Sequence, residues 1–389
     1  MKLGFELQKI SKKSRARAGI LHTAHGPVET PFFMPIATKA AIKGLTVEEV
    51  KEAGAQITLS NTYHLLLQPG MTIMKRFGGL HKFMNTKLPI LTDSGGFQIF
   101  SLGHMRKLRA DGVEFNSHLN GDKHLLTPQK AIDIQSTLGS DMMMVLDYFP
   151  GYPATRDEAE HSVATTTRWA KICLEYKKKV GRRNKKLGPA SRRQATASRG
   201  GKQLLFAIVQ GSTFKDLRLQ SAKELTAMNF DGYAVGGLAV GEPAKEMYKV
   251  LDYIVPELPA DKAHYLMGVG YPDNIVEGVK RGIDMFDCVI PTREARHGRL
   301  FLWSSRGRQK LEGKFFTTIN IRNSKFKTDS KPVDSACDCQ LCMHYTRGYL
   351  YHLFKTEEML GLRLATIHNL RFYLQLMTRL RKEIQQGRI

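Results

Sequence analysis

Three cysteines near the C-terminus form a C-x-C-x2-C pattern, made by Cys337, Cys339 and Cys342. Thiolates are soft anionic ligands, and three of them this close together can surround one tetrahedral metal ion. A closed structural site needs a fourth ligand, which we expect His368 in LATIHNLRFYL to supply. His344 and His352 are the nearer alternatives, although His344 follows the last cysteine by only two positions, which is sterically awkward. The pattern predicts one structural Zn2+, with buried or redox-active thiols as the alternative.

Three aspartates stand at or near the ends of apolar runs: Asp93 in LPILTDSGGFQ, Asp147 in MMMVLDYF and Asp287 in MFDCVIPTR. A carboxylate at the end of a buried strand costs free energy unless it has partners or a chemical task. Any one of them alone is as consistent with a turn or cap, but three in equivalent positions indicate a site. Asn61, Gln210 and the pair at 236–237 (Gly-Gly) end other apolar runs and would supply amide groups and close backbone approach.

This set of groups suits glycosidic chemistry on a nucleobase. One carboxylate can attack the anomeric carbon and form a covalent sugar intermediate, while another moves protons on the departing or entering base. A third can accept hydrogen bonds from the amine and ring N–H groups of a purine. Phe97, which follows Ser94-Gly-Gly, can stack on that base.

A regular frame must position these groups, and the sequence contains eight candidate strands. They are the apolar runs at 31–38, 56–61, 88–93, 141–147, 204–210, 232–237, 264–270 and 286–291. Near-continuous apolar runs are typical of parallel strands that are covered on both faces.

Helix signals lie between these runs. Thr46 with Glu49 and Thr155 with Glu158 have capping-box spacing, and TPQKAIDIQSTLG and FKDLRLQSAKELTAMN have helical periodicity. Alternating strands and helices predict an α/β fold, a (β/α)8 TIM barrel. A doubly wound sheet is the runner-up, but its Gly-rich dinucleotide fingerprint is absent.

Two stretches interrupt the alternation. Residues 177–202 contain eleven Lys or Arg and no Asp or Glu, which predicts a basic loop after a long helix, either contacting phosphates or acting as a solvated linker. Residues 300–389 contain the C-x-C-x2-C cluster. We therefore assign 1–299 to the main barrel and 300–389 to a zinc-binding subdomain with C-terminal helices packed on the barrel.

Composition bounds the partners and the compartment. The 389 residues carry a formal net charge of +23, which favours a polyanionic partner such as nucleic acid. A hydrophobic content of 42% is ordinary for a folded protein. No apolar run reaches the roughly 18 residues of a membrane span, and MKLGFELQKISKKSRARAG lacks the apolar core of a secretory signal. We expect a cytoplasmic protein with no membrane association.

Several segments resemble motifs of the bacterial-type tRNA-guanine transglycosylase family: TDSGGFQIFSL, IVQG, GYAVGGLAVGE, MGVGYP, MFDCVIPTR and the C-x-C-x2-C…His set. The similarity runs in unbroken order from about residue 5 to 375. The resemblance implies that Asp287 is the nucleophile and Asp93 the general acid/base. It implies a base-binding set of Asp147, Gln210, Gly237, Leu238, Phe97, Met267 and Ser94. It assigns Arg293 and Arg296 to tRNA binding and the zinc to Cys337, Cys339, Cys342 and His368.

The reaction implied by the resemblance is a ping-pong exchange catalysed by a pentosyltransferase of queuosine biosynthesis. The wobble guanine of tRNAs with a GUN anticodon (Asp, Asn, His and Tyr) leaves through a covalent Asp287–ribose intermediate, and 7-aminomethyl-7-deazaguanine enters. The resemblance also implies a homodimer.

Two positions depart from the family pattern: Phe97 stands where a tyrosine is usual, and Phe149 where a cysteine usually lines the pocket. Val240 follows the bacterial pattern and therefore favours the aminomethyl base. Direct use of queuine is the main alternative. More distant alternatives are a non-catalytic tRNA-binding partner subunit and a zinc-stabilised RNA-binding protein. The presence of both Asp93 and Asp287 argues against the partner subunit.

Overall fold

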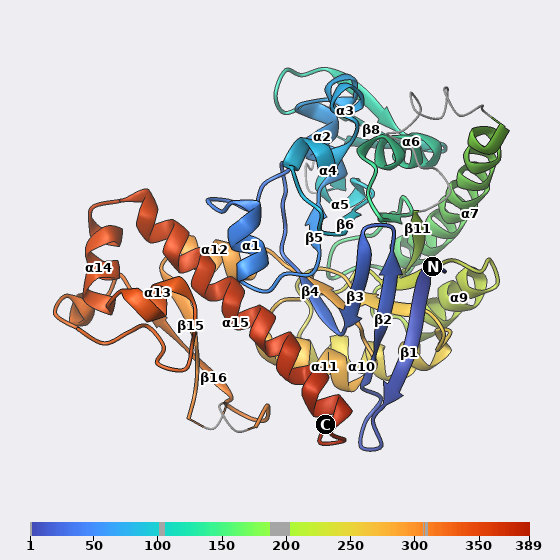
Figure 1. The fold of residues 1–389 in the computed structure, drawn as a ribbon. Coiled ribbons are helices and arrows are strands. Elements are labelled where there is room, and N and C mark those ends of the chain that lie inside the picture. Colours follow the sequence, from blue (N-terminus) through green and yellow to red (C-terminus); the bar gives the residue numbers. More distant parts are fainter. Residues whose placement is uncertain (1, 101–105, 187–202, 306, 308–309) are drawn as a thin grey trace.

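The chain folds around an eight-stranded parallel barrel (Figure 1). The structure, a computed structural model, describes residues 2–100, 106–186, 203–305, 307 and 310–389. The barrel strands are β4 (Phe32–Met34), β5 (Thr58–Ser60), β6 (Ile90–Thr92), β10 (Met142–Met144), β11 (Leu204–Val209), β12 (Gly232–Val235), β13 (Ala263–Leu266) and β14 (Met285–Asp287). Each strand overlaps one of the eight apolar runs, and their residues form the main core.

The barrel is closed. Its strands pair in the order β4-β14-β13-β12-β11-β10-β6-β5, so the last barrel strand, β14, lies beside the first, β4. The remaining seam between β4 and β5 is joined by a parallel bridge between Ile36 and Leu59, where the Ala37 N–H donates to the Leu59 carbonyl at 2.6 Å. Closure confirms the TIM barrel, since a doubly wound sheet has two open edges.

Helices follow the strands as the pattern predicted. They are α1 (Val47–Glu52), α2 (Thr62–Leu67), α3 (Met71–Phe77), α4 (Leu80–Met84), α5 (Gly96–Phe100), α6 (Pro128–Leu138), α7 (Arg156–Lys186), α9 (Lys215–Thr226), α10 (Ala244–Ile254), α11 (Pro272–Lys280) and α12 (Ile290–Arg296), with a 3-10 turn η2 (Val255–Glu257). Both capping boxes form: Thr46 and Glu49 exchange hydrogen bonds at the start of α1, and Thr155 and Glu158 do so before α7.

Part of the predicted basic loop is helical. Residues 177–186 are helical and form the last turns of α7, so our assignment of a loop to this part was wrong. Lys and Arg are good helix formers, and the Gly188-Pro189 pair that breaks a helix comes only after this stretch. Residues 187–202 lie outside the part of the chain that the structure describes.

A three-stranded antiparallel sheet covers the N-terminal ends of the barrel strands. It consists of β1 (Gly4–Ile10), β2 (Arg17–Thr23) and β3 (Gly26–Thr30). Arg17 donates from Nε at 2.9 Å to Asp284, which directly precedes β14. His25 in the β2–β3 turn contacts Asp141, which directly precedes β10, with 2.8 Å between Nδ1 and Oδ1. These contacts attach the sheet to this end of the barrel, which leaves the opposite end for a site.

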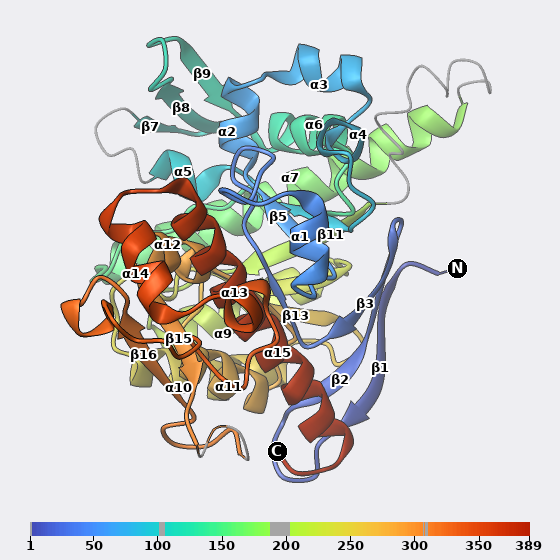
Figure 2. The same ribbon diagram turned by 60° about the vertical axis from the view of Figure 1, so that its left-hand side comes forward.

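A second small sheet belongs to that opposite end, because it follows β6 in the chain. It consists of β7 (Arg106–Arg109), β8 (Gly112–Asn116) and β9 (Lys123–Leu126), inserted between α5 and α6. Figures 1 and 2 show it with α2 and α3, well separated from the hairpin end of β1 and β2 near the C-terminus.

The C-terminal part forms its own small core and then returns to the barrel. It contains β15 (Arg299–Trp303), β16 (Phe316–Asn320), the 3-10 turn η3 (Ser324–Phe326), α13 (Gln340–His344), α14 (Arg347–Lys355) and α15 (Met359–Gln385). A separate apolar cluster surrounds the cysteines. Helix α15 packs against α11, α12, α1 and β4, so it completes the ring of helices around the barrel. The division at residues 299 and 300 stays a prediction.

None of the helices that the structure describes combines the length and the apolar character needed to cross a membrane.

Candidate active site

The predicted site residues meet at the C-terminal mouth of the barrel. Asp93 follows β6, Asp147 lies beyond β10, Gln210 follows β11, and Asp287 is the last residue of β14. Asp147 and Asp287 are buried, at 6% and 8% exposure, and Asp93 is partly buried. Parallel strands all point the same way, so residues far apart in sequence converge here.

Asp287 accepts two hydrogen bonds on one oxygen. The Tyr265 hydroxyl donates to Oδ1 at 2.5 Å, and the Gly268 backbone N–H donates to the same atom at 2.8 Å. Burial raises the pKa of Asp287, and these two hydrogen bonds oppose the rise. Burial and the neighbouring Asp287 carboxylate raise the pKa of Tyr265 well above its ordinary value, which keeps the phenol a donor.

Asp93 is bound by the start of α2. The Thr62 backbone N–H donates to Oδ1 at 2.8 Å, and the Asn61 side-chain amide donates to Oδ2. Burial raises the pKa of Asp93 to about 6; hydrogen bonds from Asn61, Thr62 and Gln98 oppose the rise, and the charge of Asp287 adds to it. Asp93 therefore exchanges its proton close to neutral pH, as a general acid/base must.

Asp147 belongs to a polar cluster with Gln210 and Ser94. The Gln210 Nε2 group donates to Oδ2 at 2.8 Å, and the Ser94 hydroxyl donates to Oδ1 at 3.4 Å. Burial raises the pKa of Asp147 to about 6, opposed by these two hydrogen bonds and assisted by the charge of Asp93. Within the described residues, the buried Gln210 Oε1 atom has no hydrogen-bond partner, so it can accept from a ligand.

Gly237 closes one side of this cluster. Its φ is +61°, and a Cβ atom there would lie 2.5 Å from Gln210 Oε1. A side chain would therefore both strain the backbone and fill the space beside Gln210. Leu238, which follows, is buried at 4% exposure.

The remaining predicted residues surround the mouth. Met267 follows β13 and is half-buried, while Phe97 on α5 is 54% exposed. Arg293 and Arg296 lie on α12, which begins three residues after Asp287. The Arg293 side chain is 51% exposed, whereas Arg296 is half-buried and donates to the Thr292 carbonyl at 2.7 Å.

Sequence reasoning missed the groups that hold these residues in place. Tyr265, in the predicted strand at 264–270, and Thr62, directly after Asn61, are examples. Glu242 accepts hydrogen bonds from the backbone N–H groups of Ala239 and Val240, which fixes the loop after β12. No sequence signal marked Glu242 beyond its place in GYAVGGLAVGE.

Arg218 on α9 is a further missed residue. It is fully buried, and its guanidinium donates to the carbonyls of Val209, Ser212 and Gly236, each within 2.8 Å, and to that of Gly237 at 3.3 Å. One side chain therefore ties together the ends of β11 and β12, where the base-binding residues were predicted. Its sequence context, a helix with no special motif, did not reveal this.

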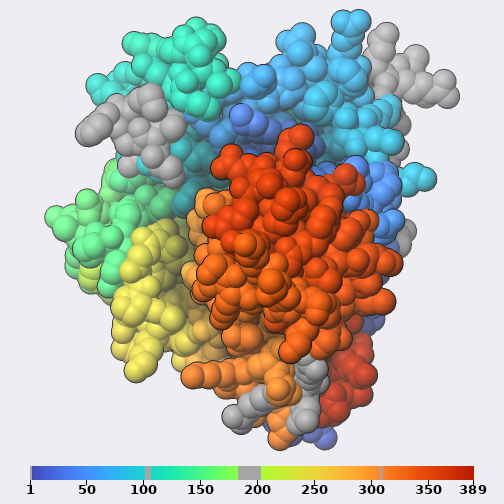
Figure 3. All heavy atoms as spheres, turned by 90° about the vertical axis from the view of Figure 1, so that its left-hand side faces the viewer, coloured from blue at the N-terminus to red at the C-terminus, as the bar shows by residue number. Residues whose placement is uncertain are grey.

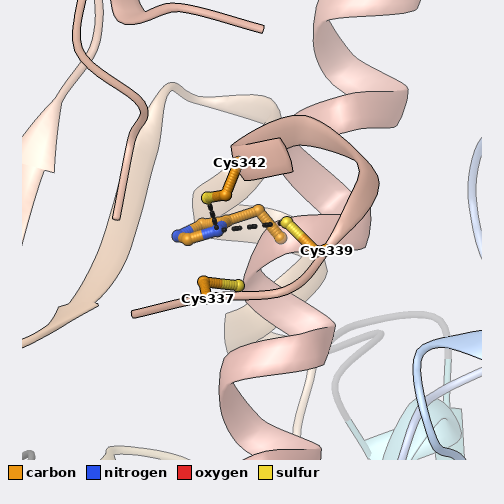
Figure 4. A group of neighbouring side chains, drawn as sticks. Cys337, Cys339 and Cys342 are labelled. Carbon is orange, nitrogen blue, oxygen red and sulfur yellow. Dashed lines mark hydrogen bonds between the residues drawn. The ribbon is translucent and has the colours of Figure 1, made fainter. Parts of the chain in front are cut away.

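The second predicted centre, the metal cluster, lies apart from the mouth. Cys337, Cys339, Cys342 and His368 are all buried, and their ligand atoms lie within 4.8 Å of one another (Figure 4). His368 Nδ1 is 3.3 Å from Cys342 Sγ and 3.6 Å from Cys339 Sγ. A tetrahedral zinc ion would hold nitrogen and sulfur ligands about 3.5 Å apart. The donor set fits zinc, and it contains His368 rather than either nearer histidine.

A second contact prepares His368 for this role. Its Nε2 atom is 2.8 Å from the Phe301 carbonyl, which fixes the ring and leaves Nδ1 as the ligand atom. The Asp334 backbone N–H is 3.4 Å from Cys342 Sγ and donates to it.

The raised pKa of Asp147 leads to a prediction about stability. A carboxyl whose pKa is about 6 in the folded state and about 3.9 in the unfolded chain stabilises the fold when protonated. This stabilising contribution is complete below the pKa of the unfolded chain, and it is lost as pH rises through the folded-state pKa of about 6. We expect Asp147→Asn to increase the free energy of unfolding by about 3 kcal/mol at about pH 8 and by little at about pH 4.

Urea unfolding at the two pH values measures this difference. Asp261→Asn is the control, because the Asp261 side chain is 78% exposed and should respond equally at both pH values. An equal increase in the free energy of unfolding at both pH values for Asp147→Asn would show that burial does not destabilise the ionised carboxylate.

Comparison with known proteins agrees with this geometry. A family model described as queuine tRNA-ribosyltransferase matches residues 11–389. Relatives with that same name include one from Desulforamulus reducens, 48% identical over 389 residues that cover 100% of this chain and 96% of the relative. One from Vibrio cholerae serotype O1 (strain M66-2) is 50% identical over 388 residues, covering 100% and 94%. One from Lysinibacillus sphaericus is 49% identical over 385 residues, covering 99% and 93%. The resemblance seen in the motifs is confirmed, and the chain belongs to the queuine tRNA-ribosyltransferase family.

Proposed function

We propose that this protein exchanges the wobble guanine of tRNAs with a GUN anticodon for 7-aminomethyl-7-deazaguanine. The observation that carries the proposal is the convergence of three buried carboxyl groups with different donors at one barrel mouth. A nucleophile, a proton carrier and a base-recognition group are the three roles that such an exchange requires.

We assign the nucleophile to Asp287. Both hydrogen bonds described for this carboxylate reach Oδ1, so Oδ2 is the oxygen that would attack C1′ of the ribose. The C1′–N9 bond of guanine breaks as the Asp287–ribose ester forms, and protonated Asp93 donates the proton with which guanine leaves, so Asp93 becomes a carboxylate. Asp93, whose pKa of about 6 suits proton exchange, takes the N9 proton of the entering base. That base then displaces Asp287 from C1′, which completes the ping-pong cycle.

The Asp147 cluster would recognise the base. Asp147 can accept hydrogen bonds from an amine and a ring N–H, and the unpartnered Gln210 Oε1 offers a further acceptor in the described part of the chain. The remaining members of the proposed pocket are Ser94, Gly237, Leu238, Phe97 and Met267. Phe97 and Met267 would hold the base between apolar surfaces.

The tRNA would be bound electrostatically. The net charge of +23 suits an RNA partner, and Arg293 and Arg296 lie on α12 directly beyond the nucleophile. A wobble base in a single-stranded anticodon loop can be flipped into a pocket of this kind. Because relatives of this chain are named for action on tRNA, we propose that the enzyme acts in the cytoplasm.

We propose a second copy of the chain as the partner for four exposed apolar side chains of the C-terminal region. Met343, Tyr349, Met359 and Leu360 are 64%, 39%, 82% and 38% exposed, and they lie close together in sequence at α13, α14 and the start of α15. Tyr349 stacks on Tyr345 with ring centroids 5.3 Å apart. Figure 3 shows the C-terminal region, in orange, over the centre of one face of the molecule. Exposed apolar side chains on one region of the chain suit a homodimer interface.

The Cys3His cluster would hold one structural Zn2+, because four protein ligands leave no position for a reacting water. When bound, the ion would join the α13 segment to α15 and take no part in base exchange.

Removal of one ligand tests the zinc proposal. We expect His368→Ala to lose the single zinc per chain and to lower the free energy of unfolding by roughly 3 kcal/mol or more, because α15 loses its link to the cysteines. Elemental analysis and urea unfolding measure the two effects. His352→Ala, an exposed histidine on the nearby α14, is the control and should keep the metal. Retention of zinc by His368→Ala would contradict the assignment.

Incorporation of labelled bases into a GUN-anticodon tRNA tests the main proposal. We expect the wild-type protein to exchange guanine and to incorporate the aminomethyl base in preference to queuine. Asp287→Ala should lose at least about a thousandfold in rate, together with the covalent RNA–protein band on a denaturing gel. Asp273→Ala, an exposed carboxylate on α11, is the matched control and should retain both.

Each contrary result favours a specific alternative. Preferential incorporation of queuine would assign the enzyme to salvage of a finished base, with the pocket around Phe149 as the structural reason. Binding of tRNA without any exchange, unaffected by Asp287→Ala, would instead indicate a non-catalytic tRNA-binding subunit or a zinc-stabilised RNA-binding protein.

A further inference from the structure

Two histidines converge on one buried aspartate at the end of the barrel opposite the mouth. His25 lies in the turn between β2 and β3, His81 lies on α4, and Asp141 directly precedes β10. One ligand atom from each of these side chains lies within 4.8 Å of the other two. Imidazole nitrogens and carboxylate oxygens are ligands that Zn2+ and related divalent ions accept in proteins. The three side chains come from separate parts of the chain, so only the fold brings them together.

Asp141 is held as a buried carboxylate. Its Oδ1 atom accepts from the His25 backbone N–H at 3.0 Å, and its Oδ2 atom accepts from the Ile90 backbone N–H at 2.9 Å. Burial raises the pKa of Asp141, but the contacts with His25 and His81 outweigh burial and hold this pKa well below its ordinary value. Asp141 is therefore an ionised ligand whose position the backbone fixes.

The His81 side chain supplies the observation that points to a ligand. It is 11% exposed, and among the described residues its buried Nε2 atom has no hydrogen-bond partner. Asp141 Oδ2 lies 3.2 Å from this nitrogen, but not in the direction that a hydrogen bond requires. Buried polar atoms nearly always have a partner, because leaving one unpaired is costly. An ion placed between His81 and Asp141 would satisfy this nitrogen.

His25 is the ligand that must turn. Its ring lies face to face with the ring of His81, with centroids 3.6 Å apart and an interplanar angle of 16°. Because a metal ion lies near the plane of each imidazole that binds it, one ring has to tilt out of this stack. The His25 side chain is 32% exposed, so it borders solvent on one side while its backbone N–H stays on Asp141. That open side also admits an ion and a water ligand.

We propose that His25, His81 and Asp141 form a second divalent-cation site, which takes Zn2+ with water as its fourth ligand. The ion would join the N-terminal sheet to α4 and to the start of β10. Both imidazoles would bind it through an unprotonated nitrogen, so acidification weakens the site. The site shares no ligand with the Cys3His cluster and lies at the opposite end of the barrel from the three aspartates. Its role is to stabilise the fold, and it does not depend on the proposed function.

Titration of Zn2+ into the protein with its Cys3His zinc already bound tests the proposal, by calorimetry and by elemental analysis. We expect one further ion per chain and a midpoint of thermal unfolding that rises with Zn2+ concentration. His81→Ala should keep the Cys3His zinc, weaken binding of the further ion at least about a hundredfold and abolish the shift in the midpoint. Even a residue that only supports a ligand changes metal affinity about ten- to a hundredfold, and His81 is proposed as a ligand itself.

A second variant and a matched control make the result specific. His25→Ala keeps the backbone contact to Asp141 and removes a partly exposed side chain, so the fold should persist while the further ion is lost. His22 on β2 is the control, because its Nε2 atom lies 2.8 Å from Glu6 Oε2 and offers one imidazole with one carboxylate. His22→Ala should still bind the further ion with wild-type affinity.

Two results would overturn the inference. Uptake of no zinc beyond the Cys3His ion by the wild-type protein would show that His25, His81 and Asp141 are joined by hydrogen bonds and charge alone. A further ion that His81→Ala or His25→Ala binds as tightly as the wild-type protein would show adventitious binding elsewhere on the chain.

Discussion

The burial of three carboxyl groups at one end of an apolar barrel is the constraint on which the rest of the site depends. Desolvation raises the pKa of all three groups, and repulsion from a neighbouring carboxylate adds to the rise for Asp93 and Asp147. The fold offsets this cost with donors from neighbouring strand ends and loops. These donors are Asn61 and Thr62 for Asp93, Ser94 and Gln210 for Asp147, and Tyr265 and Gly268 for Asp287.

The donors need fixed positions. Buried side chains behind the site fix the backbone segments that carry them. Arg218 donates to carbonyls at the ends of β11 and β12, although burial lowers its pKa to about 10. Burying a guanidinium is costly unless its donors are used, and here backbone carbonyls use them. The result is a rigid pair of strand ends beside Gln210 and Gly237. Glu242 fixes the following loop in the same way through two backbone N–H groups.

The opposite end of the barrel and its outer ring complete this support. Arg17 with Asp284 and His25 with Asp141 attach the N-terminal sheet beneath β14 and β10, the strands that carry Asp287 and lead to Asp147. Helix α15 links the metal cluster to the barrel. It carries His368 of the Cys3His cluster and packs against β4, α1 and α11. The metal cluster is therefore connected to the barrel by this helix, although it lies apart from the mouth.

The amino-acid sequence by itself determined the eight strands, the aspartates at their ends and the cysteine cluster, because these signals are local: an apolar run, its final residue, and ligand spacing. The loop predicted from it at residues 177–186 was wrong, because the helix propensity of this basic stretch outweighed its loop-like composition. Only the tertiary structure decided which groups meet. Tyr265 reaches Asp287 because β13 and β14 are neighbours in the closed barrel, and Phe97 reaches Phe149 because the chain segments after β6 and β10 lie together. Such contacts depend on strand order and closure, which no spacing along the chain encodes.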